Sequence, residues 1–146
     1  MEVKELLELT AKNKASDLHL IAGVKPTLRI NGQLEPLVNH PELGEEKVDE
    51  LVMAVLSAEQ KNKLEEEKEV DFSYALPNGV RFRVNVYYTK GVPAASFRTI
   101  PAKIPSLDEL NLPSVLQRFV EWQQGLVLIT GPAGHGKSTT VAAILE

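Results

Sequence analysis

The sequence contains no cysteine, and its three histidines lie far apart along the chain. Disulfide bonds and thiolate metal sites are therefore excluded, and the histidines offer no ligand cluster. No apolar run approaches the ~20 residues that a membrane-spanning helix needs. Residues 1–5 carry charges of both signs and lack the apolar core of a signal peptide. These absences predict a cytoplasmic protein.

The sequence also lacks an excess of basic residues. It contains 16 lysines and arginines against 20 acidic residues, which gives a formal net charge of −4. This balance gives no support for binding along a nucleic acid, so we expect no nucleic-acid partner. The hydrophobic share of 43% and the charged share of 25% are typical of a globular protein. The length suffices for one full domain and the start of a second.

Helical patterns recur in the first hundred residues. Apolar residues at helical spacing predict one amphipathic helix over residues 3–14 and another over residues 48–56. Ser57 lies three residues before Gln60, which is the spacing of a capping box at the start of a further helix. We therefore expect three helices in this part of the chain.

Strand patterns lie between these helices. The Asn31-Gly32 dipeptide favours positive φ at both positions and predicts a tight hairpin, and residues 77–79 predict a second one. We count about five strands in residues 1–100. Because hairpins rather than crossover helices connect them, the sheet should be antiparallel with helices packed on it, an α+β domain.

A change in composition follows at residues 101–113, which contain three prolines. We place the domain boundary there and assign residues 1–100 to the first domain. A short amphipathic helix should follow from Pro113, whose missing N–H is tolerated in a first helical turn. Residues 126–129 are apolar on both faces, as expected of a buried parallel strand that ends at Thr130.

A glycine-rich motif follows that strand. Residues 131–138 match the phosphate-binding pattern G-x-x-x-x-G-K-[ST] at every fixed position. Glycines allow successive backbone N–H groups to form an anion nest, and the helix beginning near Lys137 directs its positive end at the same phosphates. The apolar segment before the motif and the helical pattern after it disfavour an incidental glycine-rich turn. The predicted nucleotide-binding residues are Gly131, Pro132, Ala133, Gly134, His135, Gly136, Lys137, Ser138, Thr139 and Thr140.

Three of these side chains have predicted roles toward ATP and Mg²⁺. Lys137 should reach the β- and γ-phosphates, and the Ser138 hydroxyl should ligate the magnesium ion that bridges them. Thr139 or Thr140 would add a hydrogen bond to the α-phosphate. His135 could touch a phosphate oxygen or a neighbouring subunit, although it occupies a variable position of the pattern.

A parallel strand needs neighbours on both edges and helices on both faces, and no further strand–helix unit follows residue 146. We therefore expect this sequence to be the N-terminal part of a longer protein. It also lacks a downstream acidic residue to hold magnesium and position water, so the 146 residues alone should not hydrolyse ATP.

The motif and the segments before it resemble the retraction ATPases of type IV pili, within the secretion ATPase superfamily. The matching segments are residues 15–20, 28–32, 70–74, 81–86, 97–101 and 125–132. The resemblance implies a PAS-like first domain over residues 1–100, a linker over 101–113, and the truncated start of an α/β RecA-like P-loop ATPase domain over 114–146. It implies a homo-oligomer, a hexameric ring at the cytoplasmic face of the inner membrane. That ring would act on platform proteins of the pilus machinery while remaining at most peripheral to the membrane.

The resemblance also implies that arginines of the first domain approach the nucleotide phosphates. Arg81 and Arg83 should project from one face of a strand, and Arg98 from a strand near it. Together they could bind a γ-phosphate through bidentate hydrogen bonds, which makes them catalytic candidates beside Lys137. The alternative is an ordinary solvated sheet face with alternating arginines.

Three other residues are more simply structural. Asp17 and His19 are too few for a metal site, and a structural hydrogen bond or a contact to a neighbouring subunit is the better interpretation. Trp122 should pack at the domain junction.

Alternative functions remain open at this point. A pilus-extension or type II secretion ATPase would share the superfamily, although only about 14 residues precede residue 15, which favours the retraction type. A non-catalytic assembly module belongs to another class. A metabolic P-loop kinase is disfavoured, because such enzymes usually carry the motif near the N-terminus.

Overall fold

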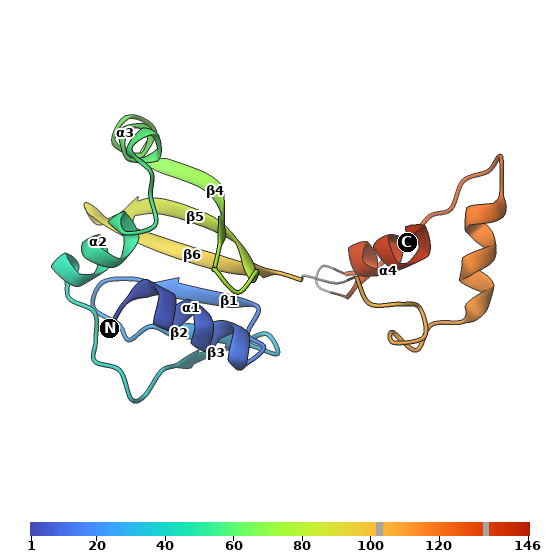
Figure 1. Cartoon of the computed structure of the whole chain (residues 1–146), viewed down its shortest axis with the longest axis horizontal. Helices are drawn as coiled ribbons and strands as arrows, with labels where there is room; N and C mark the ends of the chain where they lie inside the picture. Colours follow the sequence, from blue (N-terminus) through green and yellow to red (C-terminus); the bar gives the residue numbers. More distant parts are fainter. Residues whose placement is uncertain (102–103, 133–134) are drawn as a thin grey trace. The chain divides into compact units, whose positions relative to one another are not determined.

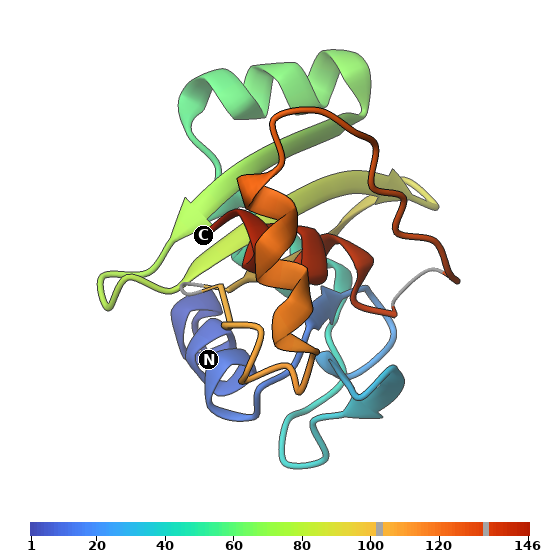
Figure 2. The same cartoon turned by 90° about the vertical axis from the view of Figure 1, so that its right-hand side faces the viewer.

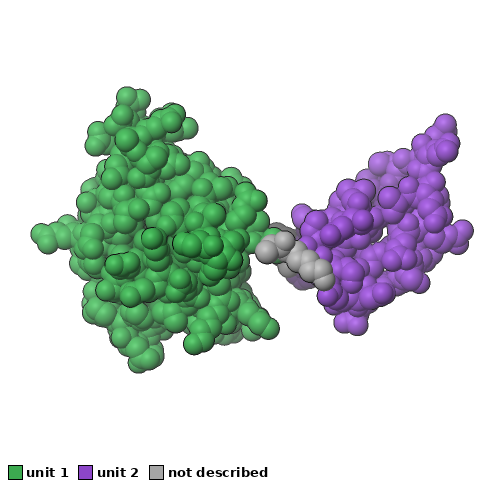
Figure 3. Space-filling view, viewed as in Figure 1, with its two compact units in different colours: residues 1–101 green, residues 102–146 purple. Residues whose placement is uncertain are grey.

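The computed structural model describes residues 1–101, 104–132 and 135–146. The chain forms two compact units, Met1–Pro101 and Ala102–Glu146 (Figure 3). The first unit ends within the predicted boundary region. The PAS-like and RecA-like assignments and the role of 101–113 as a linker stay predictions.

The first unit is built on a six-stranded sheet in which every neighbouring pair is antiparallel, with the order β3-β2-β1-β6-β5-β4 (Figure 1). This confirms the α+β prediction, with one strand more than the approximate count. The strands are β1 (Asp17–Leu20), β2 (Thr27–Ile30), β3 (Gln33–Pro36), β4 (Glu69–Ala75), β5 (Arg81–Thr89) and β6 (Val92–Ile100).

The three predicted helices of this unit are confirmed. They are α1 (Val3–Lys12), α2 (Glu45–Met53) and α3 (Ala58–Glu67). The capping box of α3 forms as expected, because the Gln60 backbone N–H donates to Ser57 Oγ at 3.2 Å and the Ser57 N–H donates to Gln60 Oε1 at 2.9 Å. Figure 2 shows α3 running along β4, the outer strand of the sheet.

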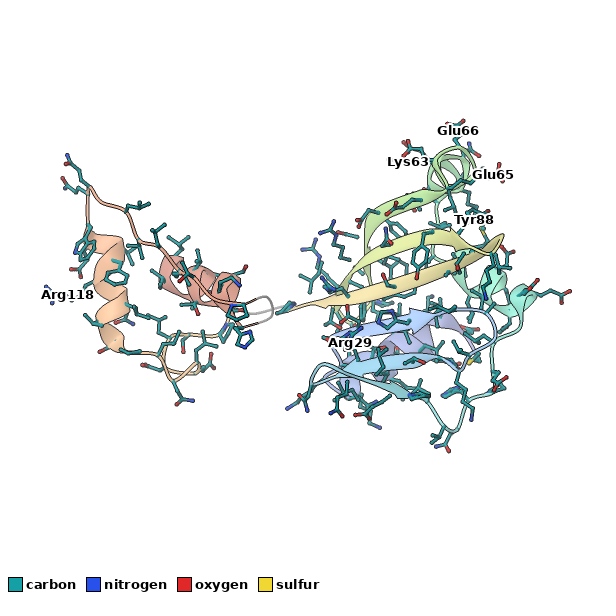
Figure 4. All side chains as sticks on the ribbon, turned by 180° about the vertical axis from the view of Figure 1, so that it is seen from behind. Arg29, Lys63, Glu65, Glu66, Tyr88 and Arg118 are labelled. Atoms are coloured by element: carbon teal, nitrogen blue, oxygen red, sulfur yellow. The ribbon has the colours of Figure 1, made fainter. Side chains whose placement is uncertain are left out.

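One face of the sheet packs under the helices and forms the core. Its fully buried side chains alternate along the central strands, as the period of two predicts. They include Leu18, Leu20, Phe82, Val84, Val86 and Phe97, and the helices add Leu6, Leu7, Val48, Val52 and Leu64. The opposite face carries the polar side chains of the same strands. On α3, Lys63, Glu65 and Glu66 point away from the sheet (Figure 4).

The turn between β2 and β3 shows the predicted backbone. Asn31 has φ of 50° and Gly32 has φ of 84°, the left-handed region that a two-residue hairpin of this type requires at both positions. The resulting hairpin places β3 at the edge of the sheet, where its side chains are exposed.

The second unit contains η1 (Ser114–Glu121), a 3₁₀ helix, and α4 (Lys137–Leu145). Ser106 and Glu109 form the reciprocal capping contacts of a short turn. The Trp122 ring packs on Phe119 with centroids 4.9 Å apart. Its side chain therefore has a packing role within this unit.

Residues 126–130 do not form the predicted strand. A strand is stabilised by backbone hydrogen bonds to a neighbour, and within the described part of this unit no strand is present to pair with it. Leu126 and Leu128 are accordingly 80% and 75% exposed. The segment is largely apolar, as the sequence indicates, but an apolar segment does not form a strand without a partner.

Candidate functional site

The glycine-rich segment 131–138 leads into the N-terminus of α4. Gly136 is the residue before the helix and has φ of 76°, a conformation that L side chains rarely adopt. Helix α4 then begins at Lys137, as the sequence predicts. Among the described residues, none caps this end through a side-chain hydrogen bond, and the first turn from Lys137 contains no acidic residue. The first backbone N–H groups and the positive end of the helix dipole are therefore available to an anion.

The Lys137 side chain folds back over the segment that precedes the helix. Its ammonium Nζ donates to the Pro132 carbonyl oxygen at 2.6 Å. A carbonyl oxygen is a neutral acceptor that a phosphate oxygen can replace with a stronger, charge-assisted bond. The lysine is thus held near the helix N-terminus.

The neighbouring hydroxyls differ in availability. Ser138 is exposed in the first turn. Thr140 Oγ1 instead donates to the Gly136 carbonyl at 3.1 Å, which ties it to its own helix. Among the predicted contacts, Ala133 and Gly134 lie outside the described residues.

The donor set fits a magnesium ion that arrives with its nucleotide. Within the described ranges, no three acidic or histidine side chains are grouped to hold a metal. Mg²⁺ commonly keeps several waters and is bound through one or two protein oxygens plus substrate phosphates. A single exposed hydroxyl at Ser138 suits that mode.

The candidate arginines lie in the first unit, on the sheet face opposite the helices. Arg83 on β5 and Arg98 on β6 are direct cross-strand partners, whereas Arg81 is opposite Ile100 nearer the sheet end. The structure thus brings two of the three predicted arginines together. They border a polar cavity of about 290 Å³ lined by Asp17, Asp71, Arg83, Asn85, Ser96 and Arg98.

Each of the two paired arginines has its own carboxylate. Arg83 donates from Nε and Nη2 to the two oxygens of Asp71 at 3.0 and 2.9 Å. These hydrogen bonds lower the pKa of Asp71 and raise that of Arg83. Arg98 donates from Nε to Asp17 Oδ1 at 2.9 Å. Two guanidinium groups directly across a sheet repel each other, and the carboxylates offset that repulsion.

Sequence reasoning did not single out Asp71. Its signal was available, because Glu69, Asp71 and Ser73 alternate with apolar residues and so had to face the same side as the arginines of the adjacent hairpin strand. Asp17 was correctly interpreted as structural.

His19 lies beside Asp17 on the same strand face. Its Nε2 is buried and has no hydrogen-bond partner among the described residues. Burial lowers the pKa of His19, and Arg29 and Arg98 add to this effect while Asp17 opposes it. The imidazole is therefore predominantly neutral near pH 7.

The sequence is similar to curated pilus ATPases. It is 42% identical over 146 residues to the type IV pilus retraction ATPase PilT of Pseudomonas aeruginosa, covering 100% of this chain and 42% of that protein. It is 46% identical over 126 residues to a twitching motility protein of Neisseria gonorrhoeae, covering 86% of this chain and 33% of the relative. No protein-family model matches the sequence.

Solved structures show the same relationship. The crystal structure of the pilus retraction motor PilT with bound ADP superposes with a TM-score of 0.84 at 39% identity, covering 99% of this chain and 42% of the other. The ATPase DotB of Legionella pneumophila superposes with a TM-score of 0.80 at 28% identity, covering 96% and 40%.

The chain spans about two-fifths of the length of the curated PilT protein and of both solved structures. Over its own length the match is nearly complete in sequence and in backbone. The resemblance predicted from the sequence is confirmed: this chain is a relative of the PilT retraction ATPases of type IV pili, within the secretion ATPase superfamily.

Proposed function

We propose that the full-length protein binds ATP with Mg²⁺ at residues 131–138 and hydrolyses it to power retraction of a type IV pilus. The observation that carries this proposal is the uncapped N-terminus of α4 behind Gly136, with Lys137 folded over it. A phosphate at this position would receive backbone N–H groups, a helix dipole and an ammonium together. The ADP bound to the related PilT motor supports a nucleotide as the ligand.

Lys137→Ala tests the proposed binding. We expect the full-length variant to lose tight binding of ATP with Mg²⁺ in isothermal titration calorimetry, because the phosphates lose their charged donor. Lys12→Ala, an exposed lysine at the end of α1, is the matched control and should bind normally. Equal affinities of Lys137→Ala and wild type would refute the proposal.

We further propose that the arginines of the first unit support hydrolysis. Guanidinium groups stabilise charge on a transferring phosphoryl group. Arg81→Ala, Arg83→Ala and Arg98→Ala should lower ATP turnover more than they lower folding stability. Normal turnover in all three variants would remove the arginines from the mechanism.

The assembly belongs to the same proposal. The protein would act as a hexameric ring at the cytoplasmic face of the inner membrane, in contact with pilus platform proteins. The described helices include none that is long and apolar enough to cross a bilayer. Sedimentation of the full-length protein with and without ATP tests the ring, and a slowly sedimenting monomer in both would contradict it.

A pilus-extension or secretion ATPase is the second candidate, and the similarity to the ATPase DotB supports it. Deleting the gene distinguishes the two. Loss of retraction leaves surface pili in place, whereas loss of an extension or secretion motor removes the pili or the exported protein. A bare surface after deletion would favour the second candidate.

A further inference from the structure

An open cavity of about 500 Å³ lies over β1, β2 and β3 in the first unit (Figure 1 labels these strands). The strand registers build its floor, because His19 on β1 is opposite Thr27 on β2, and Thr27 is opposite Pro36 on β3. Leu34 precedes Pro36 by two residues and so shares its face. The floor is therefore a row of side chains across three strands, on the sheet face that the helices leave open.

The connection between β1 and β2 forms one wall of this cavity. Ile21, Val24 and Lys25 line the cavity from that connection. Two backbone hydrogen bonds tie it to the segment before α2: the Gly23 N–H donates to the Leu43 carbonyl at 2.8 Å, and the Leu43 N–H donates to the Val24 carbonyl at 2.9 Å. Hydrogen-bonded backbone thus fixes the wall.

The cavity gathers the apolar side chains that the first unit leaves exposed. Within residues 1–101, the exposed large apolar side chains are Val24, Leu34 and Val38, at 45%, 56% and 74%. Val24 and Leu34 line the cavity, and Val38 lies beside it. Burial lowers the pKa of His19, so the floor stays predominantly uncharged near pH 7. A largely apolar hollow of this size is typical of a site for a small molecule.

Lys25 is a cation at this cavity without a counter-ion. Its side chain is half-buried, and its ammonium Nζ donates to the Val38 carbonyl oxygen at 3.0 Å at the surface. Among the described residues, no carboxylate forms an ion pair or a hydrogen bond with Lys25. Such a side chain lays its apolar stem along the wall and keeps its charge at the mouth. A carbonyl is a neutral acceptor, so an incoming anion can replace it with a stronger, charge-assisted bond.

The surrounding charges also favour an anion. Glu42 lines the cavity, but its side chain is exposed and solvent screens its charge. In the adjacent row of the same sheet face, Arg29 and Arg98 both pair with the single carboxylate of Asp17, which leaves a formal surplus of one positive charge (Figure 4 labels Arg29). The local potential is therefore positive on balance.

A small molecule suits this place better than an added peptide strand. Ile30 and Gln33 flank the two-residue turn, so Leu34 and Pro36 direct their backbone groups to the open edge of the sheet. Proline has no N–H to donate, which leaves Leu34 as the outward donor of β3. A peptide strand would gain too few ladder hydrogen bonds there to bind through its backbone.

We propose that this cavity binds a small, freely soluble organic anion. Its apolar body would lie on the floor formed by β1, β2 and β3, and its carboxylate or sulfonate would accept hydrogen bonds from the Lys25 ammonium. The site lies within the first unit alone, so the inference does not depend on the proposed ATPase function.

Two fluorescent probes that differ in charge test the role of Lys25 in the full-length protein. Anilinonaphthalene sulfonate is an aromatic anion, and phenylnaphthylamine has the same rings without the sulfonate. Lys25→Met should weaken binding of the sulfonate about tenfold and change binding of the neutral probe less than about twofold, because only the anion loses a charged donor. Lys25→Arg keeps the charge and should stay within about threefold of wild type. Glu42→Gln should strengthen the sulfonate about twofold by removing a screened repulsion.

A second pair of variants tests the apolar floor. Leu34→Asn should weaken both probes about fivefold, because it removes apolar contact without touching the charges. Val38→Asn is the matched control, since its side chain is also exposed but does not line the cavity. It should leave both affinities unchanged in the fluorescence titration.

The remaining outcomes decide between this cavity and other places. Equal losses of both probes in Lys25→Met, with no recovery in Lys25→Arg, would overturn the anion assignment. Displacement of the sulfonate by ATP with Mg²⁺, together with unchanged affinity in Leu34→Asn, would place the probe elsewhere and overturn the site. Absence of binding to the wild-type protein would overturn it as well. Loss of ATP binding in the wild type would refute the ATPase proposal and leave this inference standing.

Discussion

The two units differ in how they bury their apolar residues. In Met1–Pro101, helices and sheet enclose a continuous core in which many side chains are fully buried. In the described part of the second unit, Leu107 is the one buried hydrophobic residue, and Val120, Leu126 and Leu128 are more than half exposed. The first unit therefore carries its own stability, whereas the described part of the second buries little apolar surface.

The aromatic residues let the two units be observed separately. The single tryptophan, Trp122, lies in the second unit, and the tyrosines lie in the first, on β4 and β5. Tryptophan fluorescence therefore reports the second unit, while far-UV circular dichroism of the sheet reports mainly the first. The following predictions concern residues 1–146, and circular dichroism follows the first unit in them.

The largest effect is expected from Phe97→Ala. This ring is fully buried between sheet and helices, and its removal should lower the free energy of unfolding by about 3–5 kcal/mol through the cavity that it leaves. Urea titration followed by circular dichroism measures the change. Val115→Ala is the control in the second unit, because the Val115 side chain is 51% exposed. It should leave the urea unfolding curve measured by circular dichroism unchanged. Equal losses of unfolding free energy in Phe97→Ala and Val115→Ala would contradict a core confined to the first unit.

The next effect concerns acid. Burial raises the pKa of Asp17, but hydrogen bonds from Ser16 and Arg98 outweigh it, so the pKa falls below its ordinary value of 3.8. A depressed carboxylate stabilises the folded state above pH 3.8 and loses this contribution as pH falls through the folded pKa. Asp17→Asn should cost about 3 kcal/mol near pH 7 and flatten the acid limb of stability.

Asp71→Asn is the control for this acid dependence. The pKa of Asp71 is lowered by its hydrogen bonds to Arg83, but the side chain is 43% exposed and solvent screens the pair. Its contribution to the acid limb should be clearly smaller. If the stability of Asp17→Asn fell with acid as steeply as that of wild type, the role of Asp17 would be contradicted. The same holds if Asp71→Asn flattened the acid dependence as much as Asp17→Asn.

A smaller effect is expected at the start of α3. Ser57→Ala removes the hydroxyl that accepts the Gln60 N–H and should lower stability by about 1 kcal/mol. Ser57→Asn keeps an accepting oxygen and should recover most of the loss. Thermal unfolding of the first unit measures both, and equal melting temperatures for alanine and wild type would show that the cap contributes nothing.

The smallest effect is expected from Leu128→Gln. The leucine is 75% exposed, so the substitution should change the free energy of unfolding by less than about 0.5 kcal/mol. It should also raise the solubility of the chain by breaking an exposed apolar segment. Urea titration and a precipitation assay measure these effects, and a loss comparable to that of Phe97→Ala would mean that the segment is buried in solution.

The sequence predicted the local features well because their causes are local. Asn31-Gly32 has the backbone of a tight hairpin, and Ser57 with Gln60 caps α3. The glycine-rich motif correctly placed the start of α4 at Lys137. Each of these rests on residues a few positions apart.

Features that depend on distant residues were not predictable in the same way. The pairing of β1 with β6 joins residues 75 to 81 positions apart, and the contact of Arg98 with Asp17 spans 81 positions, so no short pattern encodes them. The partner of Arg83, Asp71, lies only 12 positions away, and the alternation along β4 already indicated that it shares the face of Arg83. The prediction of a strand at 126–130 was wrong because a strand requires backbone hydrogen bonds to a neighbouring strand, and an apolar pattern does not supply that neighbour.

The meeting of β1 and β6 has a kinetic consequence. The sheet consists of two sequence-local ladders, β1-β2-β3 and β4-β5-β6, that join where the first strand of the chain pairs with the last. Closing so long a loop costs entropy before its contacts are gained. We therefore expect each three-strand ladder to form early in refolding and the joining of the two to limit the rate.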